Sequence, residues 1–335
     1  MKDNLKNKEN FLEMNKTDEN RYVPRYECDL HCHTNRSDGN DSPTEFILRA
    51  KELKMKAVAI TDHDIIPPLF VEDENGKNIS SIIVAKENNI DLVLGYEFSC
   101  DTNVDDVHIL GYECDWENRD IITESLRAKK SKPDAYRKLC EVLSDNGYEI
   151  DFDSEILQYR DINNQVCSRK PEEVEKKMIF ETMARKGFAP SWQDAKIMVR
   201  DNPLFNIRRE KINPIDAIRI IKDAGGKAVL AHPYLIDEIV VSGEFGRLTR
   251  YEYISRLINA GLDGIEATYT YDKTSYKGTM SPAEIKKEVE DLFGKKVRFF
   301  TGGSDYHNDG KKGVRNPRMI GEAGISYKEF IKIFY

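Results

Sequence analysis

The chain has 335 residues, of which 39% are hydrophobic and 33% are charged, and this fits one large α/β domain or one domain with an insertion. Its formal net charge of −8 and its isoelectric point near 5.5 argue against broad, non-specific binding to long nucleic acid, because such binding needs a basic face. No apolar run approaches the length of about 18 residues that a transmembrane helix needs, and the polar start lacks the apolar core of a secretory signal, so we expect a cytoplasmic protein.

The first part of the chain alternates between strand-like and helix-like segments. Residues 1–24 are polar and are expected to form a disordered leader. A strand is expected over Asp29–His33, and the helix after it, Pro43–Lys54, has a clear start signal because Ser42 and Glu45 form a capping box. Further strands are expected at 57–60, 92–94 and 107–112, with a helix at 80–89.

Strand-like patterns are nearly absent from residues 116–224, which we interpret as an inserted, mainly helical subdomain. The alternation then returns, so residues 25–115 and 225–335 together would form one domain. Strands are expected near 228–231, 264–267, 297–301 and 319–324, and helices near 250–260, after Ser281 and at the end of the chain. Strands that alternate with helices predict a parallel sheet, and about seven strands in this order favour a barrel over an open sheet.

The histidines are placed in an unusual way. Side chains alternate along a strand, so His31 and His33 would share one face, with Asp29 beside them to orient a ring. Each of the six histidines follows an apolar, strand-like run, and most have an acidic residue close by. Because barrel enzymes build their active sites at the carboxyl ends of strands, we expect these histidines to converge.

The candidate ligands are imidazoles and carboxylates, which suit Zn²⁺, Mn²⁺ or iron. They are His31, His33, Asp38, His63, Glu97, His108, His232, Asp305 and His307. Nine ligands are too many for one ion, and two ions about 3.5–4 Å apart can activate water and hold the oxygens of a phosphoryl group. The sequence shows no dinucleotide-binding or P-loop motif and no arrangement typical of a serine or cysteine nucleophile.

The cysteines show no Cys-x-x-Cys pairing, and we expect all six to be reduced thiols. Cys32 and Cys100 lie next to proposed ligands, but packing is the favoured interpretation of both.

The motifs together resemble the polymerase and histidinol phosphatase (PHP) family of metal-dependent phosphoesterases. The matching segments cover about 26–115 and 225–335, and they are Asp-Leu-His31-Cys-His33-Thr, Ser-Asp38-Gly, Ile-Thr-Asp-His63-Asp, Gly-Tyr-Glu97-Phe-Ser, Val-His108-Ile-Leu-Gly-Tyr, Ala-His232-Pro and Gly-Ser-Asp305-Tyr-His307. The resemblance implies a distorted (β/α)7 barrel of the PHP fold and a trinuclear centre of manganese, iron or zinc.

The resemblance also implies roles for the ligands. The first metal would be held by His31, His33, Glu97 and Asp305, the second by Glu97, His108 and His232, and the third by Asp38, His63 and His307. Glu97 would bridge the first two ions, and a hydroxide between them would attack phosphorus in line. Glu97, Asp305 and His307 are the residues expected to be catalytic.

The helical insertion resembles the subgroup that hydrolyses nucleotide phosphates, which implies a nucleoside 3′,5′-bisphosphate or a 5′-phosphorylated RNA as the substrate. The chain departs from the subgroup in two respects. Its nearest match to Gly-Arg-Pro-His is Ser168-Arg169-Lys170-Pro171, without histidine, and its loop after His63 is longer than usual. Arg36 and Arg169 are the candidates for binding the substrate phosphate. Tyr269 and Tyr271 could stack on a base, although core packing or plain exposure would explain them equally well. Glu266 could orient a ligand or could equally be paired with a lysine.

Four alternatives remain open at this stage. Two are other phosphoesterases, acting on histidinol phosphate or on a cyclic sugar phosphate. A third is a metal-stabilised binding or regulatory module without activity. The fourth is an amidohydrolase, which would release ammonia or an amine from a mononuclear or lysine-bridged centre, but no lysine is placed at a strand end to form such a bridge.

Overall fold

The computed structural model describes residues 22–72, 76–160 and 163–335. Most of the predicted leader, residues 1–24, therefore lies outside the described residues. Contacts within the chain divide it into two compact units. Unit 1 consists of Met1–Asp62, Pro67–Gly95 and Gly264–Tyr335, and unit 2 consists of His63–Ile66 and Tyr96–Asp263. The predicted extent of the helical insertion is a different division of the chain, and it stays a prediction.

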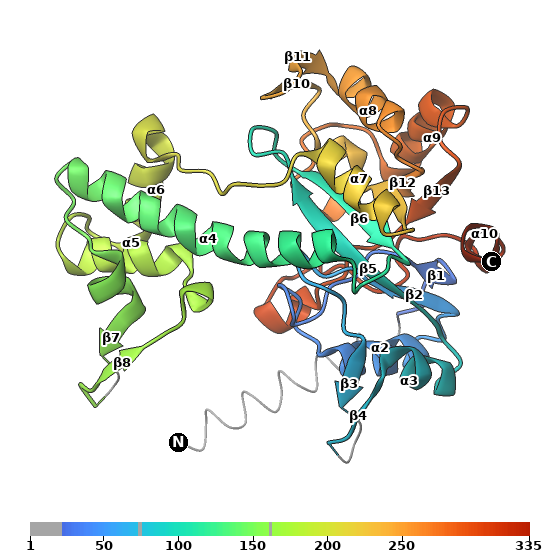
Figure 1. The fold of residues 1–335 in the computed structure, drawn as a ribbon, viewed down its shortest axis with the longest axis horizontal. Coiled ribbons are helices and arrows are strands. Elements are labelled where there is room, and N and C mark those ends of the chain that lie inside the picture. The colour runs from blue at the N-terminus through green and yellow to red at the C-terminus, as the bar shows by residue number, and fades with distance from the viewer. Residues whose placement is uncertain (1–21, 73–75, 161–162) are drawn as a thin grey trace. The chain divides into compact units, whose positions relative to one another are not determined.

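Seven strands are linked by hydrogen bonds into one sheet, in the order β1-β2-β5-β6-β9-β12-β13 (Figure 1). Their bounds are Cys28–Asp29 (β1), Ala57–Ile60 (β2), Asp91–Cys100 (β5), Val107–Tyr112 (β6), Lys227–Leu230 (β9), Gly264–Thr268 (β12) and Phe299–Gly302 (β13). The prediction of an α/β fold built on a seven-stranded sheet is confirmed.

The sheet is mixed, so the prediction of a wholly parallel sheet is wrong. The pairs β1–β2, β2–β5 and β12–β13 are parallel, whereas β6 pairs with β9 in antiparallel register, with Ile109 opposite Leu230. The physical reason is the short connection before β6. Residues 101–106 are too few for a crossover, which needs a dozen residues or more, so the chain turns back after β5.

Four α-helices lie in the described part of unit 1. They are α2 (Pro43–Glu52), α3 (Ser81–Glu87), α9 (Pro282–Phe293) and α10 (Tyr327–Phe334). All of them except α3 begin with a capping box. The predicted capping box of α2 is present, because Ser42 accepts a hydrogen bond from the Glu45 amide and Glu45 accepts one from the Ser42 amide. The buried face of α2, with Phe46 and Ile47, packs in a core that also contains Cys32 and Tyr306. Cys32 is thus a packing residue, as expected.

Unit 1 differs from the sequence prediction at three places. The expected strand Asp29–His33 is only two residues long, Cys28–Asp29. A hairpin of β3 (Phe70–Glu72) and β4 (Asn78–Ser80) was not foreseen in the segment after His63. No strand forms at 319–324, where Gly321 has a φ of 75° and turns the chain, and only Ile325 makes an isolated bridge to Cys28.

Unit 2 contains the long helix α4 and four shorter helices. They are α4 (Arg119–Asp145), α5 (Lys176–Arg185), α6 (Trp192–Asp201), α7 (Pro214–Asp223) and α8 (Arg250–Asn259). Unit 2 also contains two hairpins. One pairs β7 (Gln158–Arg160) with β8 (Val166–Ser168), and the other pairs β10 (Ile239–Ser242) with β11 (Gly246–Thr249). Among the described residues, no helix has both the length and the apolar character needed to cross a bilayer.

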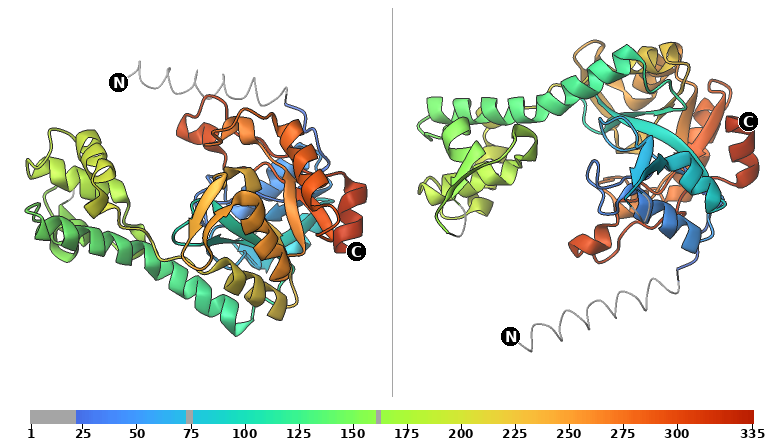
Figure 2. Two further views of the ribbon diagram at one scale, coloured as in Figure 1. Left: turned by 90° about the horizontal axis from the view of Figure 1, so that it is seen from above. Right: turned by 60° about the horizontal axis from the view of Figure 1, so that its bottom comes forward.

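The second half of α4 belongs to a separate core, which we call the helical lobe (residues 134–207). Leu139 and Leu143 of α4 are buried there together with Met183 of α5, Val199 of α6 and Phe205. Figure 2 shows α5 and α6 beside the end of α4. Within residues 134–207, the described strands are only the short pair β7 and β8, which agrees with the helical character read from the sequence.

Candidate metal-binding site

The nine predicted ligands form two clusters, one in each unit. The first cluster lies in unit 1 and consists of His31, His33, Asp38, Asp305 and His307. The second cluster lies in unit 2 and consists of His63, Glu97, His108 and His232. Residues far apart in sequence therefore meet in each unit, as the sequence pattern predicted.

Backbone pairing brings together the two halves of the first cluster. The His33 amide donates to the Tyr306 carbonyl at 2.8 Å, and the Asp305 amide donates to the His31 carbonyl at 2.8 Å. The segment after β1 therefore runs alongside the segment after β13, with a parallel bridge between Cys32 and Tyr306. Both segments follow the carboxyl ends of strands, and the pairing directs their histidine and carboxylate side chains to one place.

The side chains of the first cluster approach one another closely. His33 Nε2 lies 3.0 Å from Asp305 Oδ1, and His307 Nε2 lies 3.0 Å from Asp38 Oδ1. His31 Nε2 lies 3.6 Å from the same oxygen of Asp305. Ligand atoms of His33, Asp38 and His307 all lie within 4.8 Å of one another. The cluster is buried except for the Asp38 side chain, which is 55% exposed and gives the cluster an open side.

Two backbone features keep the first cluster in this arrangement. Asp305 has a φ of 55°, a left-handed conformation that is rare for residues other than glycine, asparagine and aspartate. At Gly303, a Cβ atom would lie 2.6 Å from the His31 amide nitrogen, so no larger residue fits without a shift of the backbone. Asp29 anchors the same loop, since its carboxylate accepts from the Ser304 amide at 2.9 Å and the Gly321 amide at 2.7 Å. Asp29 thus fixes backbone and does not orient a histidine ring.

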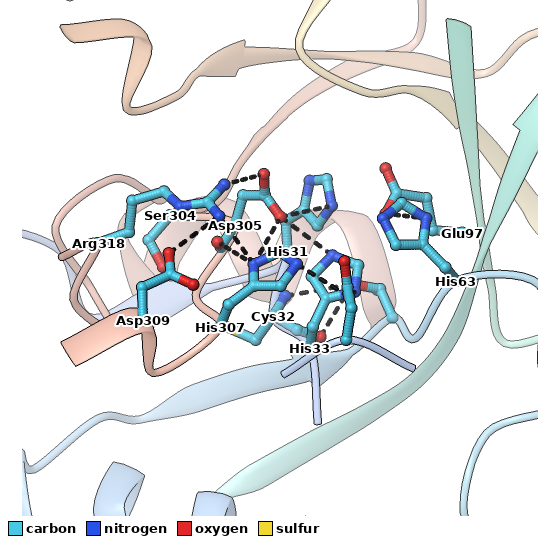
Figure 3. Close-up of polar contacts among 12 residues, drawn as sticks. His31, Cys32, His33, His63, Glu97, Ser304, Asp305, His307, Asp309 and Arg318 are labelled. Atoms are coloured by element: carbon cyan, nitrogen blue, oxygen red, sulfur yellow. Dashed lines mark hydrogen bonds and ion pairs between the residues drawn. The ribbon is translucent and has the colours of Figure 1, made fainter. Parts of the chain in front are cut away.

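Three residues outside the predicted ligand set complete the first cluster. Arg318 donates a hydrogen bond to Asp305 and contacts His307 Nδ1 at 3.0 Å (Figure 3). The Tyr269 hydroxyl donates to Asp305 Oδ2 at 2.6 Å, and His31 Nδ1 lies 3.2 Å from Glu266 Oε1. Glu266 therefore sits where a carboxylate orients a histidine ring.

These contacts change what the sequence suggested for the aromatic residues and for Arg318. Tyr269 and Tyr271 are buried, 2% and 1% exposed, so the packing alternative fits them better than stacking on a base. Arg318 was missed because it belongs to no histidine or glycine motif. Its position in an irregular loop, Gly313–Ile320, carries no sequence signal of a role.

Charge in the first cluster favours an ionised Asp305. Burial acts to raise the pKa of this carboxyl, but His307, His31 and Arg318 outweigh burial and hold the pKa well below its usual range. The carboxylate is consequently available as an anionic ligand at any physiological pH.

In the second cluster, three imidazoles converge on one carboxylate. Glu97 lies on β5, and its side chain is only 1% exposed. His108 Nδ1 on β6 lies 2.8 Å from Glu97 Oε1, and His232 Nε2 lies 3.4 Å from that oxygen. His63 Nδ1 lies 3.1 Å from Glu97 Oε2. His232 itself has a φ of 28° and stands immediately before Pro233, which starts a short helical turn.

Burial sets the protonation state of His108 in the second cluster. Burial lowers the pKa of His108 to about 4, even though Glu97 acts in the opposite direction. The imidazole is therefore neutral near pH 7, and a neutral ring keeps a lone pair for a metal ion. Ligand atoms of His63, Glu97 and His108 all lie within 4.8 Å of one another.

The donor chemistry of both clusters fits divalent metal ions. Each cluster combines buried imidazoles with carboxylate oxygens, the ligand types that bind zinc, manganese and iron. A carboxylate held ionised and an imidazole held neutral are the forms that metal binding requires. Buried groups of this kind are therefore consistent with more than one metal site.

The two predicted phosphate-binding arginines lie in different surroundings. Arg36 is exposed on the turn between His33 and Asp38. Arg169 lies in the helical lobe, where its guanidinium stacks 4.3 Å from the centre of the Tyr159 ring. A third arginine, Arg209, forms an ion pair with Asp64, the residue after His63. The substrate-binding role of Arg36 and Arg169 stays a prediction.

Comparison with known proteins identifies the relatives of this chain. Residues 29–187 match the model of the PHP domain. The chain is 25% identical over 285 residues to phosphoribosyl 1,2-cyclic phosphate 1,2-diphosphodiesterase of Eggerthella lenta, covering 83% of this chain and 93% of that protein. It is 27% identical over 227 residues to the 5′-3′ exoribonuclease Rnm of Escherichia coli, covering 61% of this chain and 64% of that protein.

A solved structure supports the same fold. The chain superimposes with a TM-score of 0.60 and 23% identity on a protein from Bifidobacterium adolescentis described as a metal-dependent phosphoesterase, covering 93% of this chain and 96% of the other. The PHP domain match, the two related enzymes and this structural similarity all agree with the fold and the ligand motifs described above. The chain belongs to the PHP domain family and is a metal-dependent phosphoesterase, a hydrolase of phosphoric ester bonds.

Proposed function

We propose that the chain hydrolyses a phosphate monoester of a nucleotide, either a nucleoside 3′,5′-bisphosphate or a 5′-phosphorylated oligonucleotide, in the cytoplasm. The observation that carries the proposal is the convergence of His63, His108 and His232 on Glu97. A phosphoesterase needs such a buried, preformed ligand set, whereas a merely structural core has no reason to surround one carboxylate with three imidazoles. The exoribonuclease of E. coli supports a nucleotide as the substrate class.

The two clusters would hold three divalent ions of manganese, iron or zinc. Such ions, when bound, supply Lewis-acid stabilisation of phosphoryl oxygens and activate water. The side chains of the protein supply charge and orient the ligands. Asp305 provides fixed negative charge, His108 stays neutral, and Glu266 orients the ring of His31. Arg36 lies beside the exposed Asp38 and would contact the substrate phosphate as it enters.

A second candidate substrate is a cyclic phosphate of ribose. The alignment with the cyclic phosphate diesterase of E. lenta spans 93% of that enzyme, more than the alignment with the E. coli exoribonuclease does. The altered stretch Ser168–Pro171 in the helical lobe also departs from the nucleotide-hydrolysing subgroup. The two substrates share the same metal chemistry and differ in the group that the phosphate carries.

The test is hydrolysis by the intact chain reconstituted with Mn²⁺, followed as phosphate release from the monoesters and as ring opening of the cyclic phosphate by chromatography. The substrates are adenosine 3′,5′-bisphosphate, a 5′-phosphorylated short RNA, a cyclic ribose phosphate and histidinol phosphate. Glu97→Gln should reduce turnover by a factor of 10³ or more, because it removes a charged ligand. Glu117→Gln is the matched control, since Glu117 is exposed and lies outside both clusters.

Each outcome has a definite meaning. Phosphate release from the nucleotide or the RNA supports the main proposal, and hydrolysis of the cyclic ribose phosphate alone replaces it with the second candidate. No hydrolysis of any substrate by the metal-loaded protein would overturn both and favour a binding module. Ammonia release from an amide substrate would instead indicate the amidohydrolase alternative.

A further inference from the structure

The helical lobe contains a cavity of about 510 Å³ that none of the proposed metal ligands lines. We call it the arginine pocket, because Arg160, Arg169 and Arg185 line it together with Tyr159, Met178 and Thr182. Its three arginines come from three elements, the end of β7, the segment after β8 and the end of α5. A volume of this size is in the range of pockets that hold small organic ligands.

None of the three arginines forms an ion pair with a carboxylate of the described residues, although Arg185 is near enough to Glu155 to help lower the pKa of that carboxyl. Arg160 donates to the Asn164 carbonyl at 2.9 Å, and Arg185 lies 3.4 Å from the Thr182 hydroxyl. The guanidinium of Arg169 stacks on the Tyr159 ring. By contrast, Arg137 and Arg200 of the same lobe are each paired with an aspartate.

The acidic residues of the pocket are already paired. Glu155 forms an ion pair with Lys186 at 2.9 Å, and Glu181 forms one with Lys177 at 3.3 Å. The lysines offset the charge of these carboxylates. The pocket therefore has a local positive charge from its arginines, although the net charge of the protein is −8. A guanidinium is well suited to phosphate, because its planar fork can donate two parallel hydrogen bonds.

The aromatic part of the pocket points to the rest of the ligand. Tyr159 is 42% exposed, and Arg169 covers its ring at 4.3 Å from the centroid. An exposed aromatic ring and a guanidinium plane are the two surfaces on which unpaired bases stack. Ile156 and Met178 add apolar surface. Phosphate donors next to a stacking platform are the combination that recognises a nucleoside phosphate.

We infer that the arginine pocket binds a nucleoside phosphate, either as a free nucleotide or as a unit of a single-stranded RNA. The inference rests on the proposed function for the choice of ligand, but it concerns binding and not turnover. It places Arg169 with Arg160 and Arg185 in one binding site of the helical lobe.

The test measures binding by the intact chain carrying Glu97→Gln, so that the ligand is not consumed. The probes are a 5′-phosphorylated hexa-adenylate RNA, AMP and ribose 5-phosphate. The pocket variant is Arg160→Gln, Arg169→Gln and Arg185→Gln combined. The matched control combines Arg137→Gln, Arg200→Gln and Arg219→Gln, which removes the same charge from arginines that pair with aspartates of unit 2.

We expect the pocket variant to weaken RNA binding at least tenfold and the control to change it less than twofold. The slope of log Kd against log salt should fall by about 2 in the pocket variant, since each lost phosphate contact on a single strand removes about 0.7. If the pocket variant also loses AMP binding, the pocket binds single nucleotides. If it loses only RNA binding, the pocket binds a nucleotide unit within an RNA strand. Equal weakening in both variants, or binding of ribose 5-phosphate as tight as that of AMP, would overturn the inference.

Two further measurements keep the test decisive. Circular dichroism shows whether the triple glutamine variant folds. If it does not fold, two other variants replace it: the single change Arg160→Gln at an exposed site and the change of all three arginines to lysine. Phosphate release from the same RNA by the unsubstituted chain is measured in parallel. Pocket-dependent binding without release would reject only the proposed function, and release with binding unaffected by the pocket variant would reject only this inference.

Discussion

The guanidinium of Arg318 donates a hydrogen bond to the carboxylate of Asp305, a predicted metal ligand whose backbone amide donates to the carbonyl of His31 in unit 1. The same guanidinium contacts His307 and donates to Asp309 Oδ2 at 3.2 Å. Asp305 Oδ2 is thus held by Arg318 and by Tyr269, while Oδ1 faces His31 and His33. Arg318 is therefore a positioning residue for the first cluster.

Replacing Arg318 should impair the enzyme without removing a ligand. We expect Arg318→Gln to lower kcat/KM by about 10- to 100-fold, because a hydrogen bond to a charged group contributes about 1.5–3 kcal/mol. Steady-state kinetics with Mn²⁺ would measure the effect. Arg318→Lys should recover part of the loss, since it restores the charge without the fork.

The control for this prediction is Arg315→Gln, which removes the same charge from an exposed position in the same loop. Equal kinetics of Arg318→Gln and the control would contradict a positioning role. A second readout is the pKa of Asp305 in the metal-free protein, which Arg318 helps to hold low and which should rise in the variant.

Gly303→Ala should disturb the first cluster through the backbone. An added Cβ would lie 2.6 Å from the His31 amide nitrogen, so β13 and the segment after β1 would have to move apart. We expect a loss of about 1–3 kcal/mol in the free energy of unfolding, typical of overpacking, and a lower content of bound metal. Urea unfolding and metal analysis would measure the two effects.

Gly310→Ala is the matched control, because a Cβ there would meet Pro317 at an ordinary contact distance of 3.7 Å. If Gly303→Ala unfolded at the same urea concentration and bound as much metal as the control, the close approach at Gly303 would have no consequence for the site.

His108 gives the metal-free protein a characteristic pH dependence. Its pKa is about 4 in the folded protein and near 6.5 in the unfolded chain, so the unfolded chain binds more protons between these values. The stability that depends on His108 is therefore present above about pH 6.5 and is lost as the pH falls toward 4. The change is on the order of 3 kcal/mol, from a shift of about 2.5 pKa units.

The measurement is urea unfolding of metal-free protein from pH 4.5 to pH 7.5, for the unsubstituted chain and for His108→Gln. We expect the variant to lose part of the pH dependence, so the difference between the two proteins should shrink on acidification. Parallel stability profiles would show that His108 does not titrate as its burial implies.

The sequence was sufficient for the ligands and for the fold class, because both depend on local patterns. Each histidine follows an apolar strand, and the carboxyl ends of strands in one sheet lie close together, so convergence follows from the pattern. The capping box of α2 was also readable, since its two hydrogen bonds join residues only three positions apart.

The contacts that depend on the path of irregular loops could not be read from the sequence. Arg318 reaches Asp305 from a loop without strand or helix, and the turn at Gly321 replaces the strand that was expected at 319–324. The reversal of β6 depends on the length of one connection, residues 101–106, which periodicity does not reveal. The role of Tyr269 required three-dimensional contacts, because an aromatic residue at a strand end fits stacking and packing equally well.

Burial of the cysteines predicts a single reactive thiol. Five of the six free cysteines are buried, and burial raises the pKa of Cys28, Cys114 and Cys140 to about 12. Such thiols are almost fully protonated near pH 8, and only the thiolate reacts with an alkylating agent. Cys167, on β8 of the helical lobe, is half-buried and is the cysteine that reagents reach most readily.

Brief treatment of the native protein with iodoacetamide should therefore modify Cys167 and leave the other five cysteines intact. Mass spectrometry of the intact chain and of its peptides would count and locate the labels. Cys167→Ser should take up almost no reagent until denaturant is added, and then five equivalents, since all six cysteines are free in the folded chain. Rapid labelling at Cys32 or Cys100 would mean that these residues are accessible and reactive, against the packing role that their burial indicates.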